Sequence, residues 1–193
     1  AAMGLNRIVD RDIVIANPRT ANREIPVGKI RVMEAALFVV VSIVLFVFSA
    51  YMLNPLCFKL SWVAIAIIAI YSYTKRVTWF SHFVLGIAIY GAPVGAWIAV
   101  TGGFDVGILL LGFAVVFWLA GFDILYALQD MEFDRSYGLY SIPQRFGVGK
   151  SLRISRISHL LTWILLMLTG VYFNLTAPFY IGIAIAGGLL GYE

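Results

Sequence analysis

Charged residues are scarce in this sequence, and the scarcity excludes an ordinary soluble domain. Only 12% of its 193 residues are Asp, Glu, Lys or Arg, and 62% are hydrophobic. A typical soluble domain is about one quarter charged and about half apolar. With a mean hydropathy of +0.93, much of the surface must face lipid. We therefore predict an all-α integral membrane protein that crosses the membrane several times.

Cysteine is almost absent, and no low-complexity segment or signal peptide is visible. The one cysteine, Cys57, excludes an intramolecular disulfide and a multi-cysteine metal site. The chain opens on Ala1-Ala2-Met3 and closes at Glu193, inside an apolar run. We interpret residues 1–193 as a single transmembrane domain that is an excerpt of a longer protein.

Apolar runs predict the membrane spans, because a helix needs about 20 predominantly apolar residues to cross a bilayer. Residues 1–14 have the pattern of the end of an earlier helix. The run of residues 60–73 is short, and we expect it to extend back through Phe58 or to be shielded by neighbouring helices. The six runs are residues 33–53, 60–73, 82–101, 106–129, 157–173 and 177–192.

Basic residues are distributed unequally between the connecting segments. Segments 15–32, 74–81 and 130–156 are rich in Lys and Arg, whereas the short connections between them hold only Lys59. The positive-inside rule places the basic segments on the cytoplasmic side, which is the inner face of the inner membrane if the protein is bacterial. The net charge of +4 thus reflects topology, although basic loops also suit an anionic substrate.

The most informative acids lie where a predicted helix meets the longest basic segment. Asp123, Tyr126, Asp130 and Asp134 are spaced i, i+3, i+7 and i+11, which puts them on one stripe of a continuous α-helix. Three carboxylates on one stripe repel one another unless a cation lies between them. Mg²⁺ is the simplest candidate, since it takes oxygen ligands and bridges carboxylates to phosphate.

A second pair, Asn6 and Asp10, is spaced i and i+4 near the start of the chain. Its amide and carboxylate could also serve a metal or a phosphate. The alternative for both groups is that the acids solvate helix ends and pair with nearby arginines. Basic residues follow both groups and could bind a diphosphate, although each is also explained by topology alone: Arg19, Arg23, Lys75, Arg76, Arg135 and Arg145.

Three segments together resemble the UbiA family of intramembrane aromatic prenyltransferases. Residues 6–28, from Asn6-Arg-Ile-Val-Asp10 to Pro26-Val-Gly28, are similar to its first aspartate-rich motif. Residues 123–147, from Asp123-Ile-Leu-Tyr126 to Arg145-Phe-Gly, are similar to its second. The segment Tyr71-Ser-Tyr-Thr-Lys75-Arg76 is similar to the family's basic segment after the fourth helix. The motifs stand in the family's order and on one predicted membrane side.

The resemblance implies a bundle of nine helices around a lipid-open cavity, of which about six and a half are present in this sequence. It also implies that both acidic motifs hold Mg²⁺ on an isoprenyl diphosphate, which ionises and alkylates an aromatic ring. Residues 141–147 are most similar to the branch that prenylates 4-hydroxybenzoate or a related aromatic acid for ubiquinone or menaquinone synthesis. Protohaem farnesylation and chlorophyll phytylation use similar motifs, so the resemblance leaves these two reactions as alternatives.

We assign roles on this basis. The expected metal ligands are Asn6, Asp10, Asp123, Asp130 and Asp134. The expected substrate-binding residues are Asn6, Arg19, Arg23, Tyr71, Lys75, Arg76 and Arg145, with Arg23 a candidate for the aromatic carboxylate. The expected catalytic residues are Asp123, Tyr126, Lys75 and Arg145. The aromatic residues that could stabilise an allylic cation are Tyr71, Tyr73, Tyr126 and Trp97.

Val14 departs from the family pattern, which places an acid there, and an apolar side chain cannot bind Mg²⁺. A catalytically impaired scaffold of the same fold is therefore one alternative, and a transporter that uses the aspartates as an ion or proton path is another. We expect His82 and His159 to be packing or interfacial residues, not metal ligands. The expected partners are the two substrates and membrane lipid, and no motif indicates nucleic acid. The sequence does not specify an oligomeric state.

Overall fold

The regular elements of the computed structural model are all helical across the part of the chain it describes, which is the backbone of residues 2–192 and the side chains of residues 2–189. The chain divides into two compact units, Ala1–Thr74 and Lys75–Glu193. Each unit is described by itself below. The predicted all-α, multi-helix membrane architecture is confirmed.

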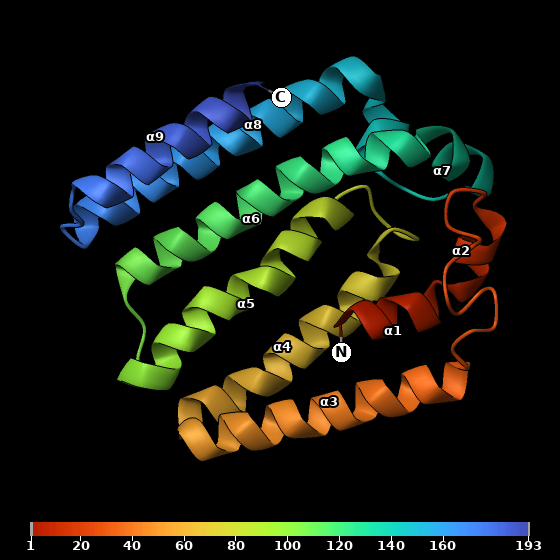
Figure 1. Ribbon diagram of the computed structural model, residues 1–193, viewed down its shortest axis with the longest axis horizontal. Helices are drawn as coiled ribbons and strands as arrows, with labels where there is room; N and C mark the ends of the chain where they lie inside the picture. Colours follow the sequence, from red (N-terminus) through yellow and green to blue (C-terminus); the bar gives the residue numbers. More distant parts are fainter. Residues whose placement is uncertain (1, 193) are drawn as a thin grey trace. The chain divides into compact units, whose positions relative to one another are not determined.

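The first unit contains two short helices followed by two long ones (Figure 1): α1 (Ala2–Val9), α2 (Arg11–Ala16), α3 (Val32–Leu53) and α4 (Pro55–Thr74). Helix α1 packs against both α3 and α4. Helix α3 begins with a capping interaction in which Glu34 accepts a hydrogen bond from the backbone N–H of Arg31, at 2.9 Å. The segment between α2 and α3 is irregular over residues 17–31, which is most of the predicted connection 15–32.

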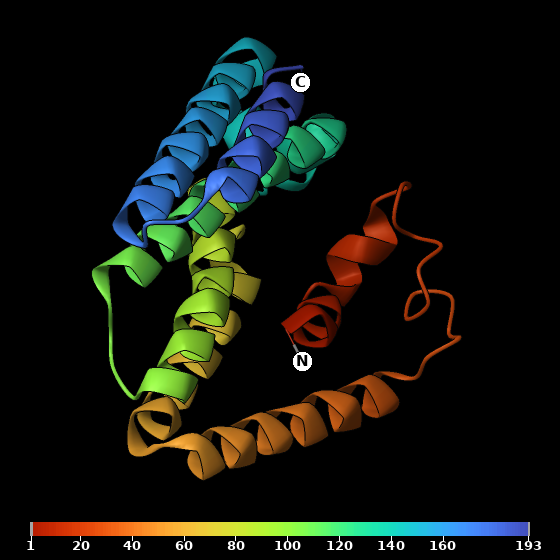
Figure 2. The same cartoon turned by 60° about the vertical axis from the view of Figure 1, so that its left-hand side comes forward.

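The second unit is built on α6, which packs between α5 and α8, and α9 lies along α8 (Figures 1 and 2). Its elements are α5 (Ser81–Thr101), α6 (Val106–Ala127), the 3₁₀ turn η1 (Leu128–Asp130), α7 (Met131–Tyr137), α8 (Ile142–Tyr172) and α9 (Ala177–Tyr192). Asp105 caps α6 by accepting from the N–H of Gly107 at 2.7 Å.

Five of the described helical segments are long and apolar enough to cross a membrane, and the apolar segment Ala177–Leu189 is shorter. The five begin at Val32, Pro55, Ser81, Val106 and Ile142. The short second run does extend back through Phe58, because α4 already begins at Pro55. Most side chains of α3 are exposed within the first unit, and only 11% of its most apolar stretch is buried. Such a surface suits lipid or further helices.

The prediction that residues 130–156 form a connecting loop is wrong, because most of this segment is helical. Helix α7 occupies its first part, and α8 begins as early as Ile142. Ser141 caps α8 by accepting from the N–H of Gln144 at 3.3 Å, and Pro143 fits the first turn. Gly147 kinks the helix with φ 73° and ψ 173°, a conformation that favours glycine. A helix that continues past the membrane surface can be as rich in basic residues as a loop, so composition alone does not distinguish the two.

Hydrogen bonds and glycines hold α6 close to its neighbours. The Ser155 hydroxyl donates to the carbonyl of Gly121 at 2.9 Å, and the Thr162 hydroxyl donates to the carbonyl of Ala114 at 3.3 Å. On the other side, a Cβ atom at Gly86 would lie 2.6 Å from the backbone oxygen of Val116. Small residues let membrane helices approach in this way, since lipid gives little hydrophobic drive for association.

Candidate active site

His82 and Asp123 form a short polar contact in the second unit, and Asp123 is one of the predicted metal ligands. The Nδ1 atom of His82 lies 2.7 Å from Oδ2 of Asp123. The backbone N–H of Ile142 donates to Nε2 of the same ring at 3.3 Å. The contact thus connects the first turn of α5, the last turns of α6 and the start of α8. The His82 side chain is 4% exposed and the Asp123 side chain 30% exposed, so the carboxylate remains accessible.

Asp134 is the centre of an adjoining group of charges. Its carboxylate interacts with the side chain of Ser141 and electrostatically with Asp130 and Lys75. Ser141 and Ile142 are consecutive, so the start of α8 contacts both the Asp134 side chain and the ring that binds Asp123. The structure therefore brings Lys75, Asp123, Asp130 and Asp134 into one region of the second unit.

The expected continuous acidic stripe is interrupted. A 3₁₀ turn at Leu128–Asp130 separates α6 from α7, and each 3₁₀ residue advances about 120° around the axis instead of about 100°. Asp130 and Asp134 are thereby rotated relative to an uninterrupted helix. Within residues 2–192, no three His, Cys, Asp or Glu side chains lie close enough together to hold a metal ion by themselves.

The basic segment that precedes α5 is attached to the loop between α7 and α8. The carbonyl of Lys75 accepts from the N–H of Tyr140 at 2.8 Å. The rings of Trp79 and Phe146 meet edge to face at 5.2 Å, and the Arg145 guanidinium lies 5.7 Å from the Phe146 ring centre. Lys75 and Arg145 thus belong to segments that contact each other, and Arg145 keeps an exposed side chain.

The predicted residues of the first motif lie in the first unit. Asp10 is 1% exposed and stands at the junction of α1 and α2. The hydrogen bond from its N–H to the carbonyl of Asn6, at 2.9 Å, keeps these two residues one helical turn apart. Val14 is 8% exposed, and its carbonyl accepts from the Thr20 hydroxyl at 3.0 Å. The position where the family has an acid is therefore a packed apolar position here, whereas Asp12 is exposed.

The loop after α2 is held against α1 by one ion pair. Arg7 and Glu24 meet at 2.6 Å. A hydrogen bond from backbone and the Arg7 guanidinium both lower the pKa of Glu24. The predicted substrate-binding residues of this loop are Arg19 and Arg23. In the sequence, Arg19 precedes the buried Thr20 and Arg23 follows it.

The aromatic candidates are distributed over both units. Tyr73 on α4 is 52% exposed and Tyr126 on α6 is 44% exposed. Trp97 contacts the Phe173 ring at 5.5 Å, at the end of α5 far in sequence from His82. This contact gives Trp97 a packing role, so it is the least suited of the four to act next to the acids.

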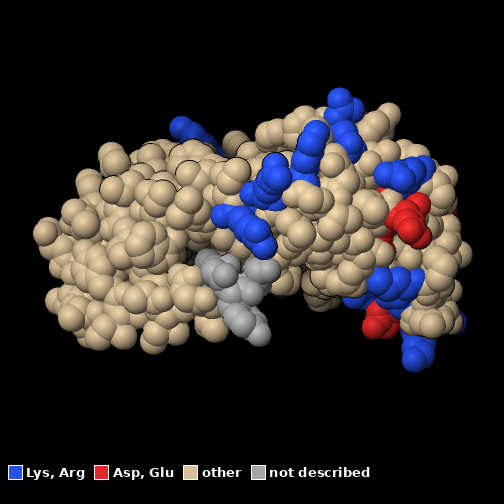
Figure 3. Space-filling model, turned by 90° about the horizontal axis from the view of Figure 1, so that it is seen from above, with Lys and Arg blue, Asp and Glu red and all other residues tan. Residues whose placement is uncertain are grey.

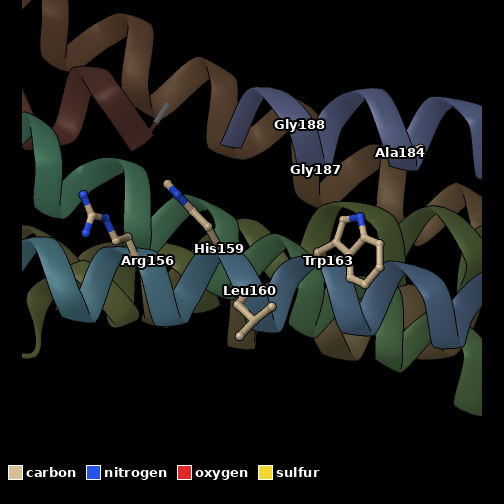
Figure 4. Close-up of a pocket in the computed structure, with 7 residues that line it drawn as sticks. All are labelled: Arg156, His159, Leu160, Trp163, Ala184, Gly187 and Gly188. Atoms are coloured by element: carbon tan, nitrogen blue, oxygen red, sulfur yellow. The ribbon is translucent and has the colours of Figure 1, made fainter. Parts of the chain in front are cut away.

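Each unit contains an apolar cavity. A cavity of about 540 Å³ lies between α8 and α9. In Figure 4, Arg156, His159 and Trp163 extend from the side of α8 on which α9 lies, and Leu160 extends from the opposite side. A cavity of about 300 Å³ lies between α1, α3 and α4. It is lined by Ala2, Leu5, Val39, Ser42, Ile43, Phe46, Ile65 and Ile68.

The α8–α9 cavity is on the opposite side of α6 from Asp123. A Cβ atom at Gly121 would lie 2.5 Å from Nε2 of His159, so Gly121 faces α8. Asp123 is two residues later, about 200° around the helix, and it contacts α5. The α1–α3–α4 cavity is lined by Leu5, which precedes Asn6 in the sequence.

These features define a multi-span helical membrane protein with a half-buried acidic cluster beside basic residues. The profile of the UbiA prenyltransferase family matches residues 1–193. The chain belongs to that family, which confirms the resemblance of the three motifs.

Several known proteins are similar over almost the whole chain. The 4-hydroxybenzoate octaprenyltransferases of Tolumonas auensis and Saccharophagus degradans are each 32% identical over 98% of it, and the chain covers 66% and 63% of those proteins. The chain thus spans slightly less than two thirds of the length of these relatives. The apo structure of a UbiA homolog from Aeropyrum pernix K1 is 32% identical, with a TM-score of 0.92 over 98% of this chain and 72% of that one. A digeranylgeranylglyceryl phosphate synthase structure, 23% identical with a TM-score of 0.72, shares the fold.

The sequence does not predict that His82 and Ser141 contact the acidic residues. Ser141 lies in the second motif but has no predicted role, and His82 is predicted to be a packing or interfacial residue. His82 is indeed buried, but it also contacts a predicted metal ligand. One feature of the sequence does point to this contact. His82 lies seven residues after Lys75, at the same predicted membrane face as the acids.

Proposed function

We propose that this protein transfers an isoprenyl chain from an isoprenyl diphosphate to an aromatic acid such as 4-hydroxybenzoate, in quinone biosynthesis. The observation that carries the proposal is the grouping of Asp123, Asp130 and Asp134 with Lys75 at the end of α6. Two relatives at 32% identity are named 4-hydroxybenzoate octaprenyltransferases, which supports this choice of acceptor and donor.

The residues present fit a role for Mg²⁺. Magnesium ions are commonly bound by one or two carboxylates together with substrate phosphates, so a complete protein cage is not required. Asp130 and Asp134 are neighbouring negative charges, and a cation relieves their repulsion. We propose Asp123, Asp130 and Asp134 as ligands in the second unit and Asn6 and Asp10 as ligands in the first. When bound, the metal stabilises negative charge on the diphosphate as the C–O bond breaks.

The chain's own residues supply the remaining functions. Lys75, Arg76 and Arg145 bind diphosphate oxygens, since cationic donors at fixed positions stabilise the charge that develops on a leaving group. Tyr126, one turn beyond Asp123, is the aromatic residue best placed to stabilise the allylic cation through its ring face. Arg19 and Arg23 are proposed to bind substrate, and Arg23 to hold the carboxylate of the aromatic acid. Tyr71 is also proposed to bind substrate.

The direct test is an assay in membranes from cells that express the protein. Radiolabelled isoprenyl diphosphate is supplied with 4-hydroxybenzoate or other aromatic acids, with and without Mg²⁺. We expect a prenylated aromatic acid whose formation requires Mg²⁺. If no acid in the panel is prenylated by a protein that is folded and membrane-inserted, the proposal is wrong.

We further propose that the basic segments face the cytoplasm. Lys150, Arg153 and Arg156 follow the kink of α8, and its later half has no charged residue. Figure 3 shows Lys and Arg side chains gathered on part of one face, beside a broad uncharged surface. In a Cys57→Ser background, an impermeant maleimide applied to intact cells should label Phe104→Cys and leave Lys150→Cys unlabelled. The reverse pattern would contradict this orientation.

The isoprenyl chain is proposed to enter the cavity between α1, α3 and α4. Seven of its eight lining residues are apolar, and one of them, Leu5, precedes Asn6 in the sequence. Ile65→Trp should fill part of this cavity and lower kcat/KM for a long-chain donor by about 10-fold, the scale of steric discrimination in an apolar pocket. Use of geranyl diphosphate should change less. Ile70→Trp is the matched control, because Ile70 lies on the same helix, is 61% exposed and does not line the cavity. Equal effects of both substitutions would contradict the assignment.

A further inference from the structure

His82 differs from a simple packing histidine because both of its ring nitrogens have defined partners. The ring is buried at the first turn of α5. Nε2 accepts a hydrogen bond from the backbone N–H of Ile142, so this nitrogen must keep its lone pair. The ring proton is therefore on Nδ1, which donates to Oδ2 of Asp123 at 2.7 Å. A main-chain group, whose position is set by the start of α8, thus selects the tautomer.

This arrangement fixes the orientation of the Asp123 carboxylate. One oxygen accepts from His82, and the other remains available because the side chain is 30% exposed. A carboxylate held by one oxygen presents the second in a defined direction. Groups that orient a ligand in this way commonly change metal affinity by about 10- to 100-fold when they are removed.

The start of α8 extends the same effect to the second acid. The Ser141 side chain interacts with Asp134, and the backbone N–H of Ile142 donates to the ring that holds Asp123. The two carboxylates lie on different helical segments, α6 and α7, separated by the 3₁₀ turn. Their relative orientation is therefore not set by one helix, and external contacts are needed to fix it.

We propose that His82 is a positioning residue that holds Asp123 for metal and diphosphate binding through its Nδ1–H. The proposal rests on the proposed function, since it assumes that Asp123 is a metal ligand. It requires a donor at the Nδ1 position of residue 82, whereas a role in packing alone requires only a side chain of suitable volume.

The test compares two amide substitutions. The amide nitrogen of Asn can occupy nearly the place of Nδ1, whereas that of Gln reaches nearer to Nε2. Mn²⁺ binding is measured by electron paramagnetic resonance on the purified protein in detergent, with inorganic diphosphate present. His82→Asn should stay within about 5-fold of the unsubstituted protein, and His82→Gln should lose about 10- to 100-fold in Mn²⁺ affinity. Thermal unfolding of both variants shows whether each is folded. Equal affinity of the two folded variants would overturn the proposal.

A double-substitution cycle separates this inference from the proposed function. In an Asp123→Asn background, His82→Gln should cause little additional loss of Mn²⁺ affinity, because the group that it positions has been removed. If Asp123→Asn alone leaves Mn²⁺ binding and turnover unchanged, the proposed metal site is wrong. If Asp123→Asn abolishes binding while His82→Gln has no effect, only the role of His82 is wrong.

Discussion

Replacing Asp134 with Asn is expected to reduce prenyl transfer by about 100-fold or more, the scale seen when one preorganised group that stabilises developing charge is removed. The substitution keeps the size of the side chain and an oxygen that can interact with Ser141, but it removes the negative charge beside Asp130. Asp130→Asn should have a similar effect. The measurement is Mg²⁺-dependent product formation in membranes at matched protein levels.

Glu132→Gln is the matched control for these substitutions. Glu132 lies between Asp130 and Asp134 in sequence and is exposed, so loss of its charge should change activity by less than a few-fold. If the two aspartate variants kept full turnover, the acids would be surface groups at a helix end. An equal loss in Glu132→Gln would point to net charge, and the proposal of specific ligands would then fail.

Replacing Gly86 with Ala should destabilise the protein by about 2 kcal/mol, within the range for inserting atoms into a packed interface. The new Cβ atom would lie 2.6 Å from the backbone oxygen and 2.9 Å from the Cα atom of Val116. Backbone cannot move aside as a flexible side chain can, so α5 and α6 must separate. Gly86 is one turn beyond His82 on α5, and the separation should therefore also lengthen the contact with Asp123.

Gly91→Ala is a control substitution that should not lower the stability of the protein. It lies on the same helix, and a Cβ atom there meets nothing within 4 Å. Ala is intrinsically favoured over Gly in a helix by up to about 1 kcal/mol, so this variant should be neutral or slightly more stable. Thermal unfolding in detergent compares the two. Equal melting temperatures for the Gly86 and Gly91 variants would show that α5 and α6 are less closely packed than described.

The two alternative functions are a transporter and a catalytically impaired scaffold, and they make different demands on the structure. A transporter needs polar groups through the depth of the membrane, yet residues 106–122 of α6 include no charged side chain. His82, Asp123 and the neighbouring acids Asp130 and Asp134 instead lie at one end of α5 and α6. Val14, which the scaffold alternative depends on, is buried. The assay above distinguishes an impaired scaffold from an active enzyme.

The helical membrane class, most span positions and the family could all be read from the sequence. Long apolar runs permit only helices in lipid, because every backbone polar group must be satisfied within its own segment. Linear motifs such as Asp123 to Asp134 keep their spacing whatever the tertiary structure. The same reasoning failed for residues 130–156, since a charged helix and a charged loop have the same composition when no lipid-facing run marks the helix.

The tertiary structure alone decided which side chains meet. His82 and Asp123 are 41 residues apart in sequence, and Ile142 is 60 residues from His82. Contacts at such separations depend on helix packing, here on the close approach of α5 to α6 at Gly86, and no local pattern encodes them. The sequence by itself determined that acids and bases are concentrated in the segments between the apolar runs. The packing of α5, α6 and α8 determined which hydrogen bond orients Asp123, because a carboxylate's direction is set by its neighbours in space.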